Sequence, residues 1–277
     1  MTADERRSAP PTGGVAAPRT HLVVATGRWL WRWWPAVLGH ALFVLAWHLV
    51  VVLGEVPSFI MPTPLETIAT LADPTYQWPG HIAITAGEVF GGYLMALAFG
   101  VVFAMAFTWS RGFERGAMPV LVTLNMVPKV AMAPLFIVWL GYGLFPNMVI
   151  AFTISFFPIL LTTLRGLREV EPDLLDLVRA LKGSRWQIFV KIQLPGALPY
   201  LFSGMKVASV LAVAGAIVGE FMGSSGGLGY LMQSRQGFLD TAGMFMAVIL
   251  VSIIGVLLYG LVLLLEKLLV VSDARIE

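Results

Sequence analysis

Few residues of this sequence carry side chains that could do chemistry, and they do not form a catalytic constellation. The 277 residues include no cysteine, which excludes disulfides, thiolate metal sites and cysteine nucleophiles. His40 and His48 are eight positions apart rather than at the i, i+4 spacing of a metal-binding pair on a helix, and we assign no metal site. No dyad of serine, lysine or acidic residues stands at a spacing useful for catalysis. We therefore predict no catalytic residues.

Charges inside apolar segments are the more informative chemistry. Lys129 lies between two apolar stretches, where an unpartnered charge at bilayer depth costs about 2.5 to 3.5 kcal/mol. Two interpretations are open. Lys129 lines a translocation path and offers a cation to an anionic solute, or it pairs with Glu88 or Glu220 inside the protein, which is the commoner arrangement.

Other polar side chains in the apolar segments could donate hydrogen bonds to a passing solute. Hydroxyl groups in membrane helices more often bond the backbone of their own helix or a neighbouring helix, so each is a weak candidate on its own. The candidate pathway residues are Asn125, Lys129, Ser155, Ser209 and Glu220.

The composition states what surrounds these residues. Hydrophobic residues make up 58% of the chain and charged residues only 12%, with a mean hydropathy of +0.82. A soluble domain of this size could not bury so much apolar surface, so the sequence predicts an all-α integral membrane protein and excludes a water-soluble enzyme. The net charge of +2 and the absence of a basic face with interleaved aromatic residues do not indicate nucleic-acid binding.

Six apolar segments are long enough to cross the hydrocarbon as helices, which takes about 20 residues. Pro128, Pro134 and Pro158, together with several glycines, predict bends in the third to fifth spans. A glycine-rich segment at 223–230 lacks the lysine ending of a phosphate-binding loop, so we expect no nucleotide there. The predicted spans are 35–53, 82–109, 117–140, 147–164, 198–222 and 242–271.

The basic residues are distributed asymmetrically around these spans. If the N-terminal tail is cytoplasmic, 15 of the 18 lysines and arginines fall on the cytoplasmic side and only Arg235 falls outside, while Lys129 and Lys206 lie within spans. The positive-inside rule therefore predicts six spans with both termini in the cytoplasm. An amphipathic turn beginning at Pro64 predicts a short helix on the outer leaflet.

The cytoplasmic segment 165–195 is too long and too regularly patterned to be a simple connection. Asp173 predicts the N-cap of a first amphipathic helix, which Gly183 ends. The apolar stripe of this helix comprises Leu174, Leu177, Val178 and Leu181.

A second short helix is predicted directly after this turn. Ser184 and Gln187 fit a capping box, and Leu194 with Pro195 ends the helix before the fifth span. Two such amphipathic helices can lie on the bilayer surface or in a groove of another protein, and the pattern leaves both open. The apolar residues that we expect this helix to expose are Trp186, Phe189 and Ile192.

The string from Asp176, DLVRALKGSRWQIFVKIQLP, resembles the EAA signature of bacterial ABC importer permeases, Glu-Ala-Ala-x3-Gly-x9-Ile-x-Leu-Pro. In this match Asp176 replaces Glu, and Lys182 occupies the glycine place with Gly183 one position later. Other strings are similar to the nitrate, sulfonate and taurine permease subgroup. They are PKVAMAPLFIVWLGYG from Pro128, SFFPILLTTLRGL from Ser155, SRWQIFVKIQLPGALPYLFSGMK from Ser184 and GLGYL from Gly227.

The resemblance implies the type I importer (MetI-like) fold in a bacterial inner membrane, with an outer helix followed by a five-helix core. It implies a dimer of permeases, identical or related, two cytoplasmic ATPases that bind ATP and Mg²⁺, and an extracytoplasmic solute-binding protein. No cofactor is expected in this chain, and coupling helices at 173–193 dock on the ATPase. The coupling residues that it implies are Asp176, Ala180, Gly183, Ser184, Arg185, Trp186, Phe189, Ile192 and Pro195.

The predicted organisation is a disordered cytoplasmic tail at 1–27, a transmembrane permease domain at 28–271 and a C-terminal cytoplasmic tail at 272–277. The expected function is the permease subunit of an ATP-driven importer for a small solute, similar to nitrate, sulfonate or taurine or a related organic nutrient. The alternative is an ion-coupled secondary transporter, which would usually show repeated halves with broken helices. The sequence does not identify the solute.

Overall fold

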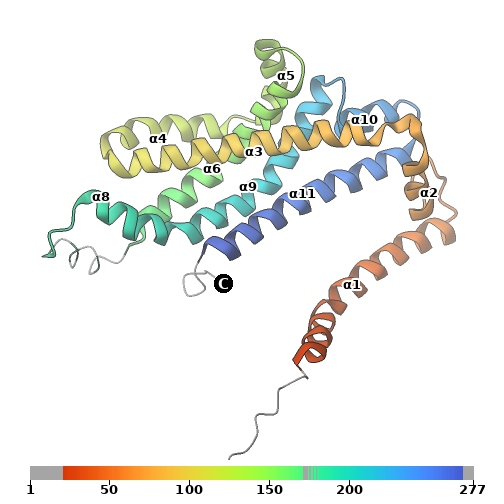
Figure 1. Cartoon of the computed structure of the whole chain (residues 1–277). Coiled ribbons are helices and arrows are strands. Elements are labelled where there is room, and N and C mark those ends of the chain that lie inside the picture. Colours follow the sequence, from red (N-terminus) through yellow and green to blue (C-terminus); the bar gives the residue numbers. More distant parts are fainter. Residues whose placement is uncertain (1–20, 171–173, 175, 177, 179, 271–277) are drawn as a thin grey trace, which may run out of the picture. The chain divides into compact units, whose positions relative to one another are not determined.

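The computed structural model describes residues 21–170, 174, 176, 178 and 180–270, with only the backbone of 21–33. Among these residues all regular secondary structure is helical and no strand is present, as the composition predicted (Figure 1). The chain divides into two units after Glu55. The helices are α1 (His21–Leu53), α2 (Pro64–Ala69), α3 (Trp78–Trp109), α4 (Arg111–Met126), α5 (Lys129–Leu140), α6 (Leu144–Arg168), α8 (Arg185–Ile188), α9 (Leu194–Gly223), α10 (Leu228–Gln236) and α11 (Thr241–Leu269).

The first unit consists of the single helix α1. It continues through Pro35 without a break and is helical from His21, so the backbone of 21–27, which the sequence assigned to the tail, is helical. Its stretch Trp34–Leu53 is long and apolar enough to cross a membrane. The rest of the predicted N-terminal tail and the predicted C-terminal tail lie outside the described residues.

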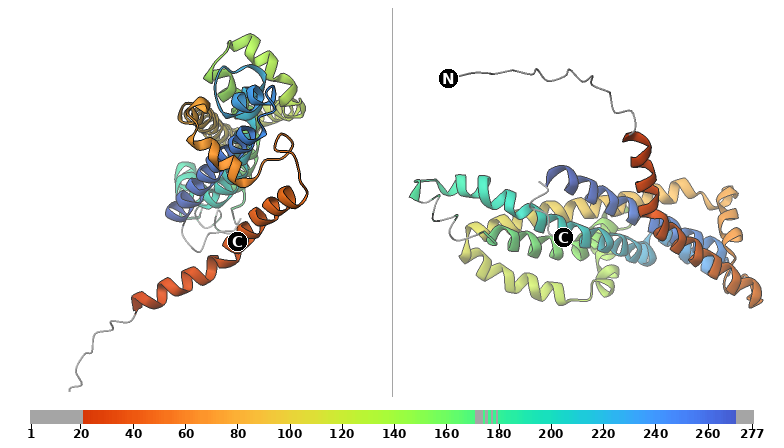
Figure 2. Two further views of the ribbon diagram at one scale, coloured as in Figure 1. Left: turned by 90° about the vertical axis from the view of Figure 1, so that its right-hand side faces the viewer. Right: turned by 90° about the horizontal axis from the view of Figure 1, so that it is seen from below.

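Four long helices of the second unit, α3, α6, α9 and α11, lie side by side (Figures 1 and 2). The contacts of α6 with α3 and α9 are the most extensive in the molecule. Small residues allow this close approach, because a Cβ atom at Gly92 or at Gly215 would lie 2.6 Å from an atom of Ala151. This packing is typical of membrane helices, where van der Waals contact replaces the hydrophobic effect as the driving force.

The third predicted span is not one bent helix but two helices. α4 and α5 meet at an angle of 99° across Val127 and Pro128. Val127 is extended because the proline ring that follows disfavours a helical conformation there. Five helices pass individually as candidate spans, and this broken pair makes the sixth, so six spans are present when the pair is counted as one.

Short elements join the ends of the long helices opposite α8. The predicted helix start at Pro64 is confirmed, with Thr63 forming a capping box at the N-terminus of α2. Two 3₁₀ turns, Thr70–Ala72 and Pro74–Tyr76, lead into α3. Tyr76 donates a hydrogen bond of 2.8 Å to Asp240, which fixes the start of α3 to the start of α11.

Candidate translocation pocket and coupling segment

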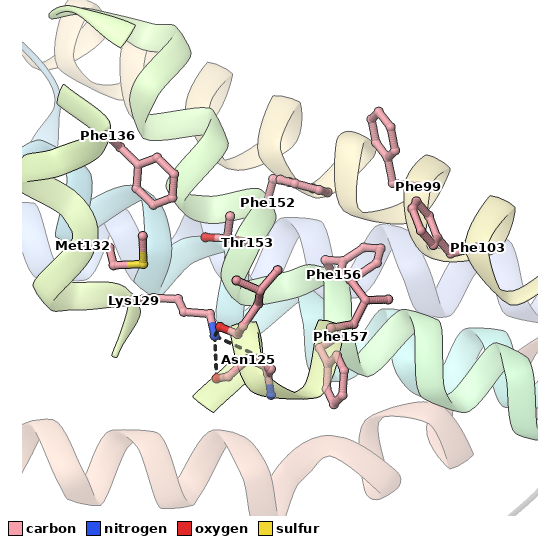
Figure 3. Close-up of a pocket in the computed structure, with 12 residues that line it drawn as sticks. Phe99, Phe103, Asn125, Lys129, Met132, Phe136, Phe152, Thr153, Phe156 and Phe157 are labelled. Carbon is pink, nitrogen blue, oxygen red and sulfur yellow. Dashed lines mark hydrogen bonds between the residues drawn. The ribbon is translucent and has the colours of Figure 1, made fainter. Parts of the chain in front are cut away.

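A pocket of about 300 Å³ lies where α4 and α5 meet the side of α3 and α6 (Figure 3). Asn125 and Lys129 stand at one edge of it, and Thr153 of α6 reaches the same space. Most of the remaining wall is aromatic. The phenylalanines that line the pocket are Phe99, Phe103, Phe136, Phe152, Phe156 and Phe157.

Four of these rings form a connected row across α3 and α6. The ring centroids are 5.5 Å apart for Phe99 and Phe152, 5.6 Å for Phe152 and Phe156, and 5.8 Å for Phe156 and Phe103. Tilted and edge-to-face pairs at such distances are favourable contacts. Our sequence analysis missed this row, although both helices carry phenylalanines four residues apart, which places each pair on one helix face.

The ammonium group of Lys129 is hydrogen-bonded to the C-terminal end of α4. Its ammonium donates to the backbone oxygens of Leu124 and Asn125, at 3.1 and 2.5 Å, and to Oδ1 of Asn125 at 3.2 Å. The last carbonyls of a helix have no partner in the helix itself and carry partial negative charge, so Lys129 caps α4 at the break. The pairing with Glu88 or Glu220 that the sequence favoured is not formed.

Glu88 and Glu220 are instead fully buried between α3, α6 and α9. Asn147 donates to Oε1 of Glu88 at 2.8 Å, and Thr85 donates to Oε1 of Glu220 at 2.5 Å. The backbone N–H of Gly229 donates to Oε2 of Glu220. Glu220 therefore anchors the start of α10 to the bundle and does not line the pocket.

The two buried carboxyl groups lie close enough to interact electrostatically. Oε2 of Glu88 has no hydrogen-bond donor within the part of the chain that the structure describes. The donors that hold the two acidic residues are therefore the neutral groups of Asn147, Thr85 and Gly229.

The structure separates the other pathway candidates from the pocket. The hydroxyl groups of Ser155 and Ser209 are buried and donate to backbone oxygens of their own helices, at 2.7 and 2.8 Å. Of the five residues predicted for the pathway, the structure brings together only Asn125 and Lys129. The hydrogen bonds of the two serines to their own backbone match the general behaviour of hydroxyls in membrane helices.

The segment that we predicted to be cytoplasmic turns differently from the prediction. Leu174, Asp176, Val178 and Ala180 are helical, whereas the predicted N-cap at Asp173 lies outside the described residues. Ala180 is the last helical residue, and Lys182 in the turn that follows has a φ of +57°. The N–H of Gly183 donates to the oxygen of Val178 at 2.9 Å, which is the six-to-one bond of a Schellman motif.

This turn corrects the role that we assigned to Gly183. The left-handed conformation, which favours glycine, belongs to Lys182, the residue at the glycine place of the EAA signature. Gly183 is required for a different reason, because a Cβ atom there would lie 2.4 Å from Cγ1 of Val178. The turn is therefore tight despite the lysine.

The capping box of Ser184 and Gln187 is confirmed at the start of α8. The predicted end of this helix at Leu194 and Pro195 is wrong. α8 passes through a π-helical turn, Phe189–Gln193, directly into α9, so one helical rod runs to Gly223. The wider turn accommodates Pro195, which has no N–H and whose ring would clash with the carbonyl four residues earlier.

Only one of the three apolar residues expected on this helix surface is prominent there. Trp186 is 63% exposed, whereas Phe189 is 4% exposed and Ile192 is half-buried. The Phe189 ring packs 5.2 Å from the ring of Trp109 at the end of α3. The exposure predicted for Phe189 is therefore wrong, because the helix lies against the end of α3 and buries that face.

Comparison with known proteins assigns the class. The family model described as "Binding-protein-dependent transport system inner membrane component" matches residues 96–271. The chain belongs to this family, the membrane-spanning permeases of binding-protein-dependent importers. It is therefore a multi-pass protein of the bacterial cytoplasmic membrane and a transport subunit rather than an enzyme.

Particular relatives agree with this class. The chain is 34% identical over 251 residues to the riboflavin transport system permease protein RibX of Chloroflexus aurantiacus, covering 87% of this chain and 92% of the relative. It is 29% identical over 269 residues to the putative aliphatic sulfonates transport permease protein SsuC of Bacillus subtilis, covering 96% of each. The inward-facing MetNI methionine ABC transporter matches with a TM-score of 0.50 and 19% identity, over 66% of this chain and 93% of that chain. This last likeness supports the type I importer fold.

Proposed function

We propose that two copies of this permease, or this chain and a related one, form a translocation pathway that two cytoplasmic ATPases drive and an extracytoplasmic binding protein supplies. The family match over residues 96–271 is the observation that carries this proposal. ATP and Mg²⁺ bind to the ATPases. The two permeases respond to ATP through contacts with those subunits.

The coupling contact lies on the turn between the first cytoplasmic helix and α8. Leu181 and Trp186 are 74% and 63% exposed there, and both are large apolar residues next to a capped helix start. A groove on the ATPase that accepts these side chains would grip the end of the rod formed by α8 and α9. Movement of the groove would then tilt α9 as one body, because the helix is continuous.

The solute pathway passes the pocket that Asn125 and Lys129 border. The pocket lies beside the break between α4 and α5, where a helix pair can change its angle without unfolding either helix. Relatives are named for riboflavin and for aliphatic sulfonates, so we propose a small organic solute. Ser155 and Ser209 support the helices around this path.

Copurification tests the assembly. Tagged permease is expressed with the ATPase and binding protein of the same operon, and the complex is reconstituted in proteoliposomes. We expect a complex of two permease and two ATPase chains that takes up solute only with ATP. Uptake driven by a proton or sodium gradient without the ATPase would refute the proposal in favour of an ion-coupled transporter.

The coupling contact is tested with two tryptophans of equal exposure. Trp186→Ala should lower the affinity of permease for ATPase roughly tenfold, a common loss when a central interface aromatic is truncated. Trp139→Ala on α5 is the matched control, because Trp139 is also 63% exposed. Equal effects of the two substitutions, or unchanged ATPase affinity with Trp186→Ala, would place the turn on the bilayer surface.

A further inference from the structure

From the pocket we infer the chemical class of the solute, an inference that rests on the proposed function. We propose that the pocket bordered by Lys129 takes a planar heteroaromatic solute of one or two rings that carries N–H or O–H donors on one edge. Three observations lead to this class: how the Lys129 donors are used, how the phenylalanines are arranged, and which hydrogen-bonding groups remain.

The ammonium of Lys129 has no donor left for a small anion. Its three N–H groups match the three oxygens at the end of α4 that it contacts, at 2.5, 3.1 and 3.2 Å. An inorganic anion entering the pocket would lose its hydration and gain mainly contacts with phenyl rings, with the neutral amide of Asn125 as a donor at the pocket edge. Because the ammonium group of Lys129 is already bonded to oxygens at the end of α4, the pocket is a poor site for nitrate or for a sulfonate group.

The phenylalanine row offers what a flat ring needs. Phe99, Phe152, Phe156 and Phe103 present connected ring faces and edges, and Phe136 of α5 stands across the pocket (Figure 3). A solute ring between them can stack or meet an edge, and each such contact is favourable beyond the burial of area. The volume of about 300 Å³ is at the small end for ligand pockets, which limits the solute to one or two rings.

The polar edge of the pocket can accept hydrogen bonds. The hydroxyl hydrogen of Thr153 is used in a bond of 2.9 Å to the oxygen of Ile150, which leaves its oxygen as an acceptor. Oδ1 of Asn125 accepts from Lys129 and has a second lone pair. A ring whose edge carries N–H or O–H groups complements these two oxygens, and the amide N–H groups of Asn125 can donate to an acceptor beside them.

The test measures binding to the purified permease–ATPase complex by equilibrium dialysis with five probes. Uracil and adenine are planar and carry N–H donors; benzenesulfonate is a ring with an anionic acceptor group; taurine and nitrate have no ring. We expect uracil or adenine to bind at least tenfold more tightly than taurine and nitrate, with benzenesulfonate between them. Equal or tighter binding of taurine, nitrate or benzenesulfonate overturns the inference, and so does the absence of binding by every probe.

Two variants assign the binding to this pocket. Phe152→Leu should weaken uracil and adenine about fivefold, while Phe145→Leu on the same helix, exposed and outside the pocket, leaves binding unchanged. Thr153→Val keeps the side-chain shape and should weaken only the probes with N–H donors. If all three variants fold and bind every probe as tightly as the unaltered protein does, the inference is overturned.

The same preparation separates failure of the inference from failure of the proposed function. ATP hydrolysis by the copurified complex reports that permease and ATPase are assembled, whatever the probes do. An active complex that imports a solute without a ring refutes only the solute class. A permease that never assembles with an ATPase refutes the proposed function.

Discussion

Two regions of this permease hold charged side chains among apolar helices, and they do so in opposite ways. At the break between α4 and α5, Lys129 bonds the carbonyls at a helix end beside an open pocket. Between α3 and α9, Glu88 and Glu220 are fully buried and accept hydrogen bonds from neighbouring side chains and backbone. At a broken helix, the free backbone carbonyls of the helix end bind the charge, and a pocket remains beside it. In a packed bundle, the partners of a charge must come from neighbouring helices, and no space remains beside it.

The neighbouring residues explain the difference. Around the carboxyl pair, Gly219 approaches Asn147 so closely that a Cβ atom there would lie 2.5 Å from its Oδ1. Small residues thus bring the helices together and exclude space. Around Lys129 the facing residues are phenylalanines, whose rings hold α3 and α6 apart from α4 and α5. This contrast supports the proposed role of the pocket in transport, whereas Glu220 attaches α10 to the bundle.

The largest effect is expected from removing the carboxyl group that anchors α10. Glu220→Leu leaves the hydroxyl of Thr85 and the N–H of Gly229 buried without their acceptor. Removing one partner of a buried charged network costs about 3 to 5 kcal/mol, so we expect a large loss of folded permease. Chemical unfolding in detergent, followed by intrinsic tryptophan fluorescence, measures the change.

A milder substitution in the same pair is the control. Glu88→Gln keeps the Oε1 acceptor for Asn147 and replaces Oε2, which accepts no hydrogen bond, with an amide nitrogen of similar size. We expect a free energy of unfolding within about 1 kcal/mol of the unaltered protein. If this variant is as unstable as Glu220→Leu, the carboxyl group of Glu88 contributes more than its acceptor for Asn147.

An intermediate effect is expected at the helix break. Lys129→Met removes the cap of α4 and should lower the free energy of unfolding by about 1 to 2 kcal/mol, the range for a partly buried cation at a helix C-terminus. The variant should also broaden the distance distribution between spin labels on α4 and α5. Lys129→Arg restores a cation and should narrow this distance distribution again. A distribution unchanged in Lys129→Met would show that Pro128 alone sets the break.

Local features of the fold could be predicted from the sequence, and features that depend on several helices could not. The capping boxes, the Pro64 helix start and the spans follow from short patterns, because neighbouring residues decide them. The partners of Lys129 depend on a 99° break that Pro128 permits but does not specify. The burial of Phe189 depends on Trp109, 80 positions away.

The continuous rod through Pro195 illustrates the same limit. Leucine followed by proline ordinarily indicates a helix boundary, and here a π-helical turn absorbs the proline instead. The pocket could have been located more closely, because the spacing of the phenylalanines on two predicted spans was visible. The sequence could not show which helices face each other across the pocket, because their arrangement depends on the packing of α6 between α3 and α9.

The smallest effect is expected at the turn before α8, where Lys182 acts through its backbone conformation rather than through its charge. Lys182 is exposed and holds a φ of +57°, a conformation that costs a residue with a Cβ atom about 1 kcal/mol relative to glycine. Lys182→Gly should therefore slow the exchange of the Gly183 amide hydrogen about fivefold, because this amide bonds the oxygen of Val178 across the turn. Lys182→Ala keeps the Cβ atom and should leave the exchange rate unchanged. If alanine and glycine slow the exchange equally, the lysine ammonium and not the backbone strain limits the turn, and the two lysines at helix ends would then act alike.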